Sequence, residues 1–292
     1  MLSSSVFISA LFAGAIAILV TLAIERWGGL TGGLLGTIPS TVVPAAAGMY
    51  IVGGEDLLIE SMAIVPFGML INGLFLCVWV VLPPYLRDSK SPLILTTVGA
   101  LVVWAVCGSV LLFGMSLAFE NGISAMTVSL TGLTLLVVFA VAMNWHPKPS
   151  PKGQHSVTVK VLVLRGSAAA LAIGIAVWMS AQGQPLIAGL AAVFPAIFLT
   201  SMVALWVAQG PTVPQGAAGP MTLGGVSVGV YACAAMYSLP SYGLYIGSLI
   251  AWLLAVVGWS LPAYVALRRH SANLYALGEA SSSDNDASIS SN

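Results

Sequence analysis

Charged residues are scarce in this chain of 292 residues: Asp, Glu, Lys and Arg together make up 6% of it, against about 25% in a typical soluble domain. Hydrophobic residues make up 59%, and the mean hydropathy is +1.01. Because so little polar surface cannot cover a globule in water, we exclude a soluble protein. In lipid every backbone amide must be paired internally, which leaves a helical bundle or a closed barrel.

The chain also has no excess of positive charge and few side chains that could bind a metal. Nine Lys and Arg balance nine Asp and Glu, which excludes the basic surface that a nucleic-acid partner requires. Cys77, Cys107 and Cys233 lie within apolar segments and lack paired spacing, which argues against disulfides and zinc. All three histidines lie outside the apolar segments. The sequence therefore predicts no cofactor and no metal centre.

Long apolar runs dominate the chain. Runs of about 20 residues are long enough to cross a bilayer as helices, whereas the strands of a barrel would alternate over about ten residues. We expect an all-α integral membrane protein with about nine transmembrane helices, in the cell (inner) membrane. The nine segments are 5–24, 29–52, 58–83, 93–117, 124–144, 161–181, 186–208, 218–238 and 242–267. The first lacks the positive start of a signal peptide and is interpreted as a helix.

The basic residues predict the orientation of this bundle. With nine crossings, all nine Lys and Arg fall on one side, whereas the opposite connections carry Glu55, Asp56 and Glu120. Because basic residues favour cytoplasmic connections, we expect the N-terminus outside and the C-terminus in the cytoplasm. If segment 29–52 entered the membrane and returned to the same side, Arg26 would lie on the same side of the membrane as Glu55 and Asp56. We therefore interpret that segment as a crossing that is broken in the middle.

A constant shift of 156 residues aligns 33–84 with 189–240 without a gap. Eight positions are identical, and seven of them are Gly, Pro or Cys rather than the Leu, Val and Ala that dominate an apolar chain. The identical pairs are Gly33/Gly189, Leu34/Leu190, Pro39/Pro195, Gly54/Gly210, Gly68/Gly224, Gly73/Gly229, Cys77/Cys233 and Pro84/Pro240. The alignment predicts an internal repeat, which is typical of many secondary transporters.

The first four segments then match the last four, and the fifth is an extra crossing that inverts the second unit relative to the first. The predicted organisation has four parts. These are a four-helix repeat at 1–118, a connector helix with a Pro-rich cytoplasmic loop at 119–157, an inverted four-helix repeat at 158–268 and a disordered cytoplasmic tail at 269–292.

A family resemblance accompanies the repeat. The stretch from Leu164 through the phrase Ile-Ala-Gly-Leu-Ala-Ala-Val-Phe-Pro, which ends at Pro195, resembles the GlpM family of small four-span bacterial inner-membrane proteins. The first half resembles it through 50–60 and 64–69. The likeness covers the two central segments of each half, and it departs at 209–215, where Gln-Gly-Pro-Thr-Val-Pro-Gln replaces an acidic loop. It implies a duplicated small membrane unit and names no substrate.

Candidate binding residues lie where proline interrupts the second segment of each half. A proline removes an amide donor and frees a carbonyl one turn earlier, so such a break can present backbone dipoles to a solute or an ion. The alternative is that Pro and Gly merely kink the helices and permit close packing. The candidates at the breaks are Thr37, Pro39, Ser40, Thr41, Pro195, Thr200 and Ser201.

Two polar residues of the third segment complete the set of candidates. A carboxylate in lipid is costly, so Glu60 either faces a cavity as a proton or cation relay or reaches the outer interface beside Glu55 and Asp56. Asn72 lies deeper in the same segment, about a third of a turn around from Glu60, so the two need not share a face. Asn72 could alternatively cross-link helices.

The sequence thus favours a secondary transporter of a small molecule or an ion. The alternative is a non-transporting accessory or assembly subunit of a membrane complex. An enzyme is disfavoured because the apolar segments hold no histidine, no triad and no paired carboxylates, with Glu60 the one plausible general acid or base. Expected partners are the lipid bilayer, the solute and, in a homodimer, a second copy of the chain.

Overall fold

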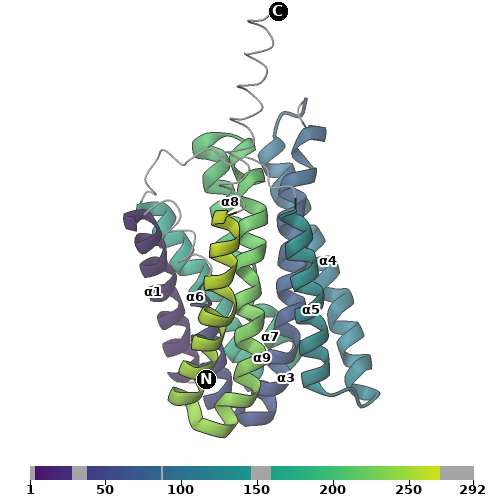
Figure 1. Cartoon of the computed structure of the whole chain (residues 1–292), viewed down its shortest axis with the longest axis vertical. Helices are drawn as coiled ribbons and strands as arrows, with labels where there is room; N and C mark the ends of the chain where they lie inside the picture. Colours follow the sequence, from purple (N-terminus) through teal and green to yellow (C-terminus); the bar gives the residue numbers. More distant parts are fainter. Residues whose placement is uncertain (1–3, 28–37, 87, 146–158, 270–292) are drawn as a thin grey trace, which may run out of the picture.

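The computed structural model of the chain describes residues 4–27, 38–86, 88–145 and 159–269. Helices account for all the regular secondary structure in these ranges, which confirms the predicted all-α class, and they form one elongated bundle (Figure 1). The elements are α1 (Ser4–Trp27), α3 (Val42–Val81), the 3-10 turn η1 (Pro83–Leu86), α4 (Pro92–Glu120), α5 (Ala125–Met143), α6 (Val159–Ala181), α7 (Pro185–Ala192), α8 (Ala196–Gln209), α9 (Thr212–Ala255) and the π-helical turn η2 (Val256–Ser260).

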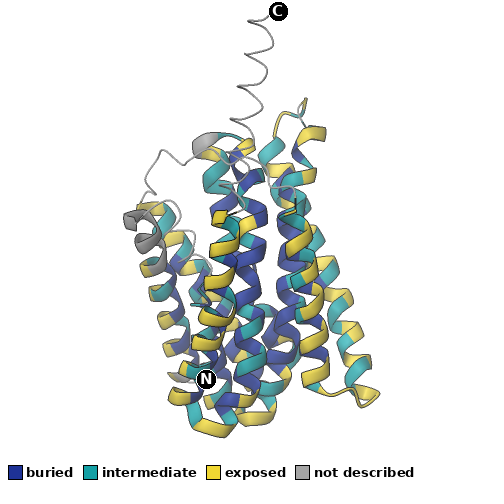
Figure 2. Ribbon diagram, viewed as in Figure 1, coloured by how far each residue is buried: buried dark blue, intermediate teal, exposed yellow. Residues whose placement is uncertain are grey.

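The helices have the length and composition that a bilayer requires. Six stretches of the described chain are long and apolar enough to cross a membrane: Val42–Val81, Pro92–Glu120, Ala125–Met143, Val159–Ala181, Pro185–Val207 and Thr212–Arg269. Helix α4 buries only a few residues, and the rest, which are mostly apolar, are exposed or half-buried (Figure 2). Such a surface is stable in contact with lipid, so the chain is a helical integral membrane protein.

Two of these stretches are too long to cross a membrane once. A straight helix of the 40 residues of α3 would extend about 60 Å, twice the hydrocarbon thickness of a bilayer. Gly54 interrupts α3 with a φ of 73° and a ψ of −168°, and Gly243 interrupts α9 with a φ of 75° and a ψ of 173°. The chain folds back at these glycines, as Figure 1 shows for α9 at the lower end of the bundle. The connection expected between 52 and 58 is therefore a single-residue turn.

Gly54→Ala should destabilise the protein through the backbone alone. A Cβ at Gly54 would have no atom within 4 Å, so its cost is the backbone conformation: a positive φ with an extended ψ is essentially restricted to glycine and costs another residue about 1 to 3 kcal/mol. Gly114→Ala is the matched control, since Gly114 also has open space around it but lies inside helix α4. In thermal unfolding in detergent, Gly54→Ala should lower the melting temperature, whereas the control should not lower it. Equal melting temperatures would contradict the strained turn.

The core lies along the contact between α3 and α9, which pack against each other at the centre of the bundle (Figure 2). Helix α1 packs on α6 at one flank, and α5 packs on both α3 and α9 at the other. Helix α7 lies against α3 and α6, and α8 against α6 and α9. The short link between α7 and α8 is therefore enclosed by helices from both halves of the chain.

Candidate functional site

Helix α7 ends at Ala192 and α8 begins at Ala196, so the crossing expected over 186–208 is broken at Pro195 as predicted. Pro195 has no N–H to continue the ladder and adopts a φ of −75° and a ψ of 36°. The amide of Leu199 donates to the carbonyl of Pro195 at 2.7 Å, which starts α8. Val193, Phe194 and Pro195 thus form a short non-helical link between α7 and α8.

The other predicted break lies directly before α3. Residues 38–41 are not helical, and α3 begins only at Val42. Pro39 is buried, and Ser40 and Thr41 are half-buried. The predicted candidate Thr37 lies outside the described residues.

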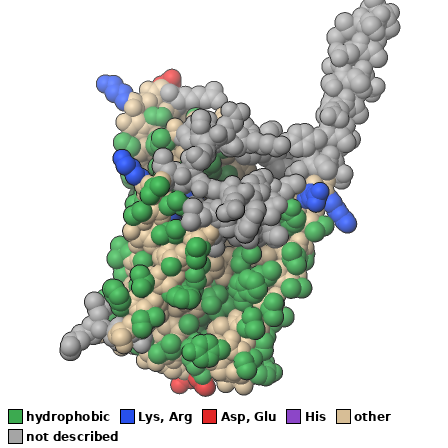
Figure 3. Space-filling view, turned by 90° about the vertical axis from the view of Figure 1, so that its left-hand side faces the viewer, with side chains coloured by type: hydrophobic (Ala, Val, Ile, Leu, Met, Phe, Trp, Pro, Cys, Tyr) green, Lys and Arg blue, Asp and Glu red, His purple; other side chains and the backbone are tan. Residues whose placement is uncertain are grey.

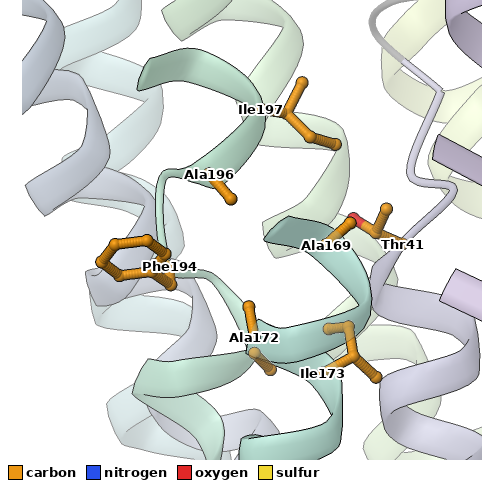
Figure 4. Close-up of a pocket in the computed structure, with 8 residues that line it drawn as sticks. Thr41, Ala169, Ala172, Ile173, Phe194, Ala196 and Ile197 are labelled. Atoms are coloured by element: carbon orange, nitrogen blue, oxygen red, sulfur yellow. The ribbon is translucent and has the colours of Figure 1, made fainter. Parts of the chain in front are cut away.

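The two breaks meet at one small cavity. Figure 4 shows its lining side chains, which come from the start of α3, from α6, from the link between α7 and α8 and from the start of α8. The lining residues are Thr41, Ala169, Ala172, Ile173, Ala192, Phe194, Ala196 and Ile197. The cavity volume is about 20 Å³, which is enough for about one water molecule.

The lining determines what this cavity can hold. Thr41 supplies the one polar side chain, and the other seven lining residues are Ala, Ile and Phe. A charged group placed here would lose its hydration without gaining a counter-ion from the lining, which costs several kcal/mol. The cavity therefore suits an uncharged group that can share a hydrogen bond with Thr41.

Asn72 holds the broken helix in place from the side of α3. Its Nδ2 donates to the carbonyl of Val193 at 2.7 Å, and its Oδ1 accepts from Trp104 Nε1 of α4 at 2.9 Å. Asn72 is 2% exposed, so these bonds lie inside the bundle. The ring of Trp104 also packs edge-on against Phe194, with ring centroids 5.1 Å apart. The side-chain amide of Asn72 thus joins α3, α4 and the link between α7 and α8. Its acceptor, Val193, is next in the chain to Phe194, which lines the cavity.

The remaining predicted candidates lie elsewhere. Thr200 donates its hydroxyl to the carbonyl of Ala196 within its own helix at 2.8 Å, and Ser201 is buried. Neither lines the cavity. Glu60 is exposed, whereas Asn72 is buried, so the two residues do not share a face. The structure thus brings together the segments of Pro39, Thr41 and Pro195 and ties Asn72 to them, but it leaves Glu60, Thr200 and Ser201 outside.

Several residues of the site were not found by sequence reasoning. The wall from α6 is made of Ala169, Ala172 and Ile173, and the run of alanines there was the one available signal. Nothing in the sequence indicated that Trp104 belongs to the site, because its partner Asn72 is 32 residues away. Within the described ranges, no three His, Cys, Asp or Glu side chains lie close enough to bind a metal.

Comparisons of the chain with protein-family models, with curated proteins and with solved structures give no match. Its function must therefore be argued from its own geometry.

Proposed function

We propose that the chain is a secondary transporter that moves a small solute by alternating access between two inverted repeats. One observation carries this proposal: the broken segments of the two halves meet at a single cavity. Thr41 and Ile197 both line it, and they are 156 residues apart, which is the shift that aligns the halves. A site between inverted repeats at paired helix breaks is the arrangement that alternating access requires.

Reciprocal contacts between α3 and α9 support the repeat. In units related by a two-fold axis, a contact between two residues is repeated by the residues that correspond to them. A Cβ on Gly73 would lie 3.1 Å from Thr222, and a Cβ on Gly229 would lie 3.6 Å from Pro66. Gly73 corresponds to Gly229 and Pro66 to Thr222 under the shift of 156, so these two contacts are related by the repeat.

The same rule holds for α1 and α6, outside the stretch in which the sequence alignment was found. A Cβ on Gly166 would lie 2.6 Å from Ile18, and a Cβ on Gly174 would lie 3.2 Å from Ala10. Ala10 corresponds to Gly166 and Ile18 to Gly174. The shift of 156 therefore relates contacts from residue 10 onward, which supports repeats at 1–118 and 158–268.

Some residues meet their own counterparts, as expected on a two-fold axis. A Cβ on Gly225 would lie 2.7 Å from Met69, and a Cβ on Gly14 would lie 3.1 Å from Ala170. In each pair the residues are 156 apart. These pairs support an axis that passes between α3 and α9 and between α1 and α6.

Backbone conformation repeats as well. Gly54 and Gly210, which are counterparts, both have a positive φ (73° and 83°) and an extended ψ (−168° and 177°). The turns at Gly54 and Gly243 divide α3 and α9, as the proposed nine crossings require. The likeness to the GlpM family would make each repeat a copy of one small four-helix unit.

The charges support the proposed orientation in the cell (inner) membrane, with the N-terminus outside and the C-terminus in the cytoplasm. Lys and Arg side chains lie toward the upper end of the bundle, where an acidic side chain also lies, and no Lys or Arg is seen at the lower tip, where acidic side chains lie (Figure 3). The exposed basic residues are Lys90, Lys160, Arg268 and Arg269, and the exposed acids include Glu55, Asp56 and Glu120. Basic residues favour the cytoplasmic side.

A search for the solute should precede the transport assay. The purified protein is unfolded thermally in detergent against a panel of neutral amino acids, polyols, amides, inorganic ions and charged metabolites. A solute at 100 times its Kd should stabilise the fold by about 2.7 kcal/mol. That solute is then tested for saturable counterflow in liposomes. If nothing stabilises the protein and it co-purifies with a fixed partner, the accessory-subunit alternative replaces the transporter.

Ala172→Leu should abolish both the stabilisation by the solute and the counterflow. The three added carbon atoms would fill a cavity that has room for about one water, so the solute would be excluded. Ala105→Leu is the matched control, because Ala105 is exposed on α4 and makes the same change of side chain on the lipid-facing surface. Counterflow should also be lost in Pro39→Ala with Pro195→Ala, and full counterflow in that double variant or in Ala172→Leu would contradict the site.

A further inference from the structure

Two buried hydroxyls lie without a partner in the half of the bundle that contains the turn at Gly54. Ser61 of α3 and Ser180 of α6 have no exposed surface, and within the described residues their Oγ atoms make no hydrogen bond. Other hydroxyls of the bundle donate to a carbonyl of their own helix, as Thr97 does to Leu93. A buried hydroxyl without a bond destabilises the fold, so these two hydroxyls are candidates for contact with a ligand.

Both hydroxyls lie where α3, α6 and α7 pack on one another. A Cβ on Gly53 would lie 3.0 Å from the Oγ of Ser180 and 2.8 Å from Leu57, so the Ser180 hydroxyl points at the turn of α3. Ser61 lies one helical turn beyond Leu57 on the same helix, and its backbone carbonyl faces Gly189 of α7. The two serines therefore belong to one region, between the turn of α3 and the start of α7.

This region leads to the cavity. On α6, Ser180 and Ile173 share a buried face and are about 10 Å apart along the axis, and Ile173 lines the cavity (Figure 4). On α7, Gly189 lies three residues before Ala192, which also lines the cavity. Small buried residues lie along these elements between the hydroxyls and the cavity: Ala45, Gly48, Ala176 and Ala188.

We propose that Ser61 and Ser180 form an outer binding station for the solute, on a route from the outside to the cavity. The solute contacts the two hydroxyls when α3, α6 and α7 separate at this end, and then passes to Thr41. The route is closed in this structure, because Ser61, Ser180 and Met49, which lies between Thr41 and the turn of α3, are completely buried. This inference rests on the proposed function, which requires a solute and a cavity at the end of the route.

The chemistry of the station indicates the class of solute. A hydroxyl both donates and accepts a hydrogen bond but cannot neutralise a charge. The segments that form the route, 27–54, 61–86 and 166–267, contain no Asp, Glu, Lys, Arg or His, and Glu60, although next to Ser61 in the chain, is exposed. The station therefore takes a small uncharged solute with a hydroxyl or an amide group, which also suits the cavity at Thr41.

Cysteine labelling tests the station before the solute is known. In a background with the three native cysteines changed to Ala, the probe methyl methanethiosulfonate is applied to Ser180→Cys in liposomes. Only the thiolate reacts, and it forms where water reaches the thiol, so Ser180→Cys should react about tenfold faster than Ser238→Cys. Ser238 is the matched control because it is also buried, but its hydroxyl donates to the carbonyl of Gly247 at 2.8 Å. If Ser180→Cys does not fold, Ser61→Cys takes its place with the same expectation.

Removing both hydroxyls tests the contact with the solute. Ser61→Ala with Ser180→Ala should lower counterflow about tenfold without lowering the melting temperature, because neither hydroxyl has a bond to lose in the described part of the chain. Ser238→Ala should lower the melting temperature and leave counterflow unchanged, because it loses a buried bond outside the route.

The outcomes separate this inference from the proposed function. Labelling no faster than that of Ser238→Cys would overturn the station. Fast labelling with full counterflow in the double variant would mean that water alone reaches the two hydroxyls, and would also overturn it, whereas the transporter would stand. If the unmodified protein shows no counterflow with any solute, the transporter is overturned and the station with it.

Discussion

Gly189→Ala is expected to lower the free energy of unfolding by about 3 kcal/mol, the upper range for overpacking a helix contact. Gly189 of α7 lies directly against the backbone of α3, where its added Cβ would overlap the carbonyl oxygen of Ser61 and the Cγ2 of Ile64. A carbonyl inside a helix cannot rotate away as a side chain can. The helices would have to separate, which would disturb the link that α7 leads into.

Gly108→Ala is the control for this prediction. Gly108 is buried on α4 and also faces α7, but its Cβ would meet only the terminal Cδ2 of Leu190, at 3.1 Å. A flexible side chain can accommodate such a contact. The measurement is thermal and denaturant unfolding in detergent, with size-exclusion profiles to check that each variant is folded. A loss in Gly189→Ala no larger than that in Gly108→Ala would contradict the close contact of α7 with α3.

The helices could be predicted from the sequence because a bilayer leaves few alternatives. Lipid requires backbone groups to be paired within a helix, so each apolar run of about 20 residues has a simple structural meaning. The ends expected for the fifth segment, 124–144, agree closely with α5, Ala125–Met143. The prediction was less accurate for α9, which begins at Thr212 rather than 218, since Pro214, Gly216 and Pro220 are tolerated within it.

The breaks at Pro39 and Pro195 could be predicted because proline acts locally, through its own missing N–H. The walls of the cavity could not, because they depend on which helices come together. Asn72 reaches Val193, which is 121 residues away in the sequence. The sequence allowed Glu60 to face either a cavity or the outer interface, and in the structure Glu60 is exposed. The sequence could not decide between the two, because burial depends on neighbouring helices that hydropathy does not identify.

Asn72→Ala should lower the free energy of unfolding by about 2 kcal/mol, since it leaves one buried and one half-buried group without partners. These are the carbonyl of Val193 and the Nε1 of Trp104. Trp104→Phe keeps an aromatic ring against Phe194 but removes the indole N–H, and should cost about 1 kcal/mol. The control is Thr97→Val on α4, because the Thr97 hydroxyl donates only to Leu93 of its own helix and its loss should have little effect.

Combining Asn72→Ala with Trp104→Phe separates a shared interaction from two independent ones. If the indole and the amide act as one unit, the double variant should be more stable than the sum of the single losses by about 0.6 to 1 kcal/mol, a typical coupling for polar groups in a membrane bundle. Unfolding in detergent measures all three variants on one scale. Strictly additive losses would mean that Trp104 and Asn72 support the bundle separately. The bond from Asn72 to Val193 and the ring contact of Trp104 with Phe194 would then hold the link independently of each other.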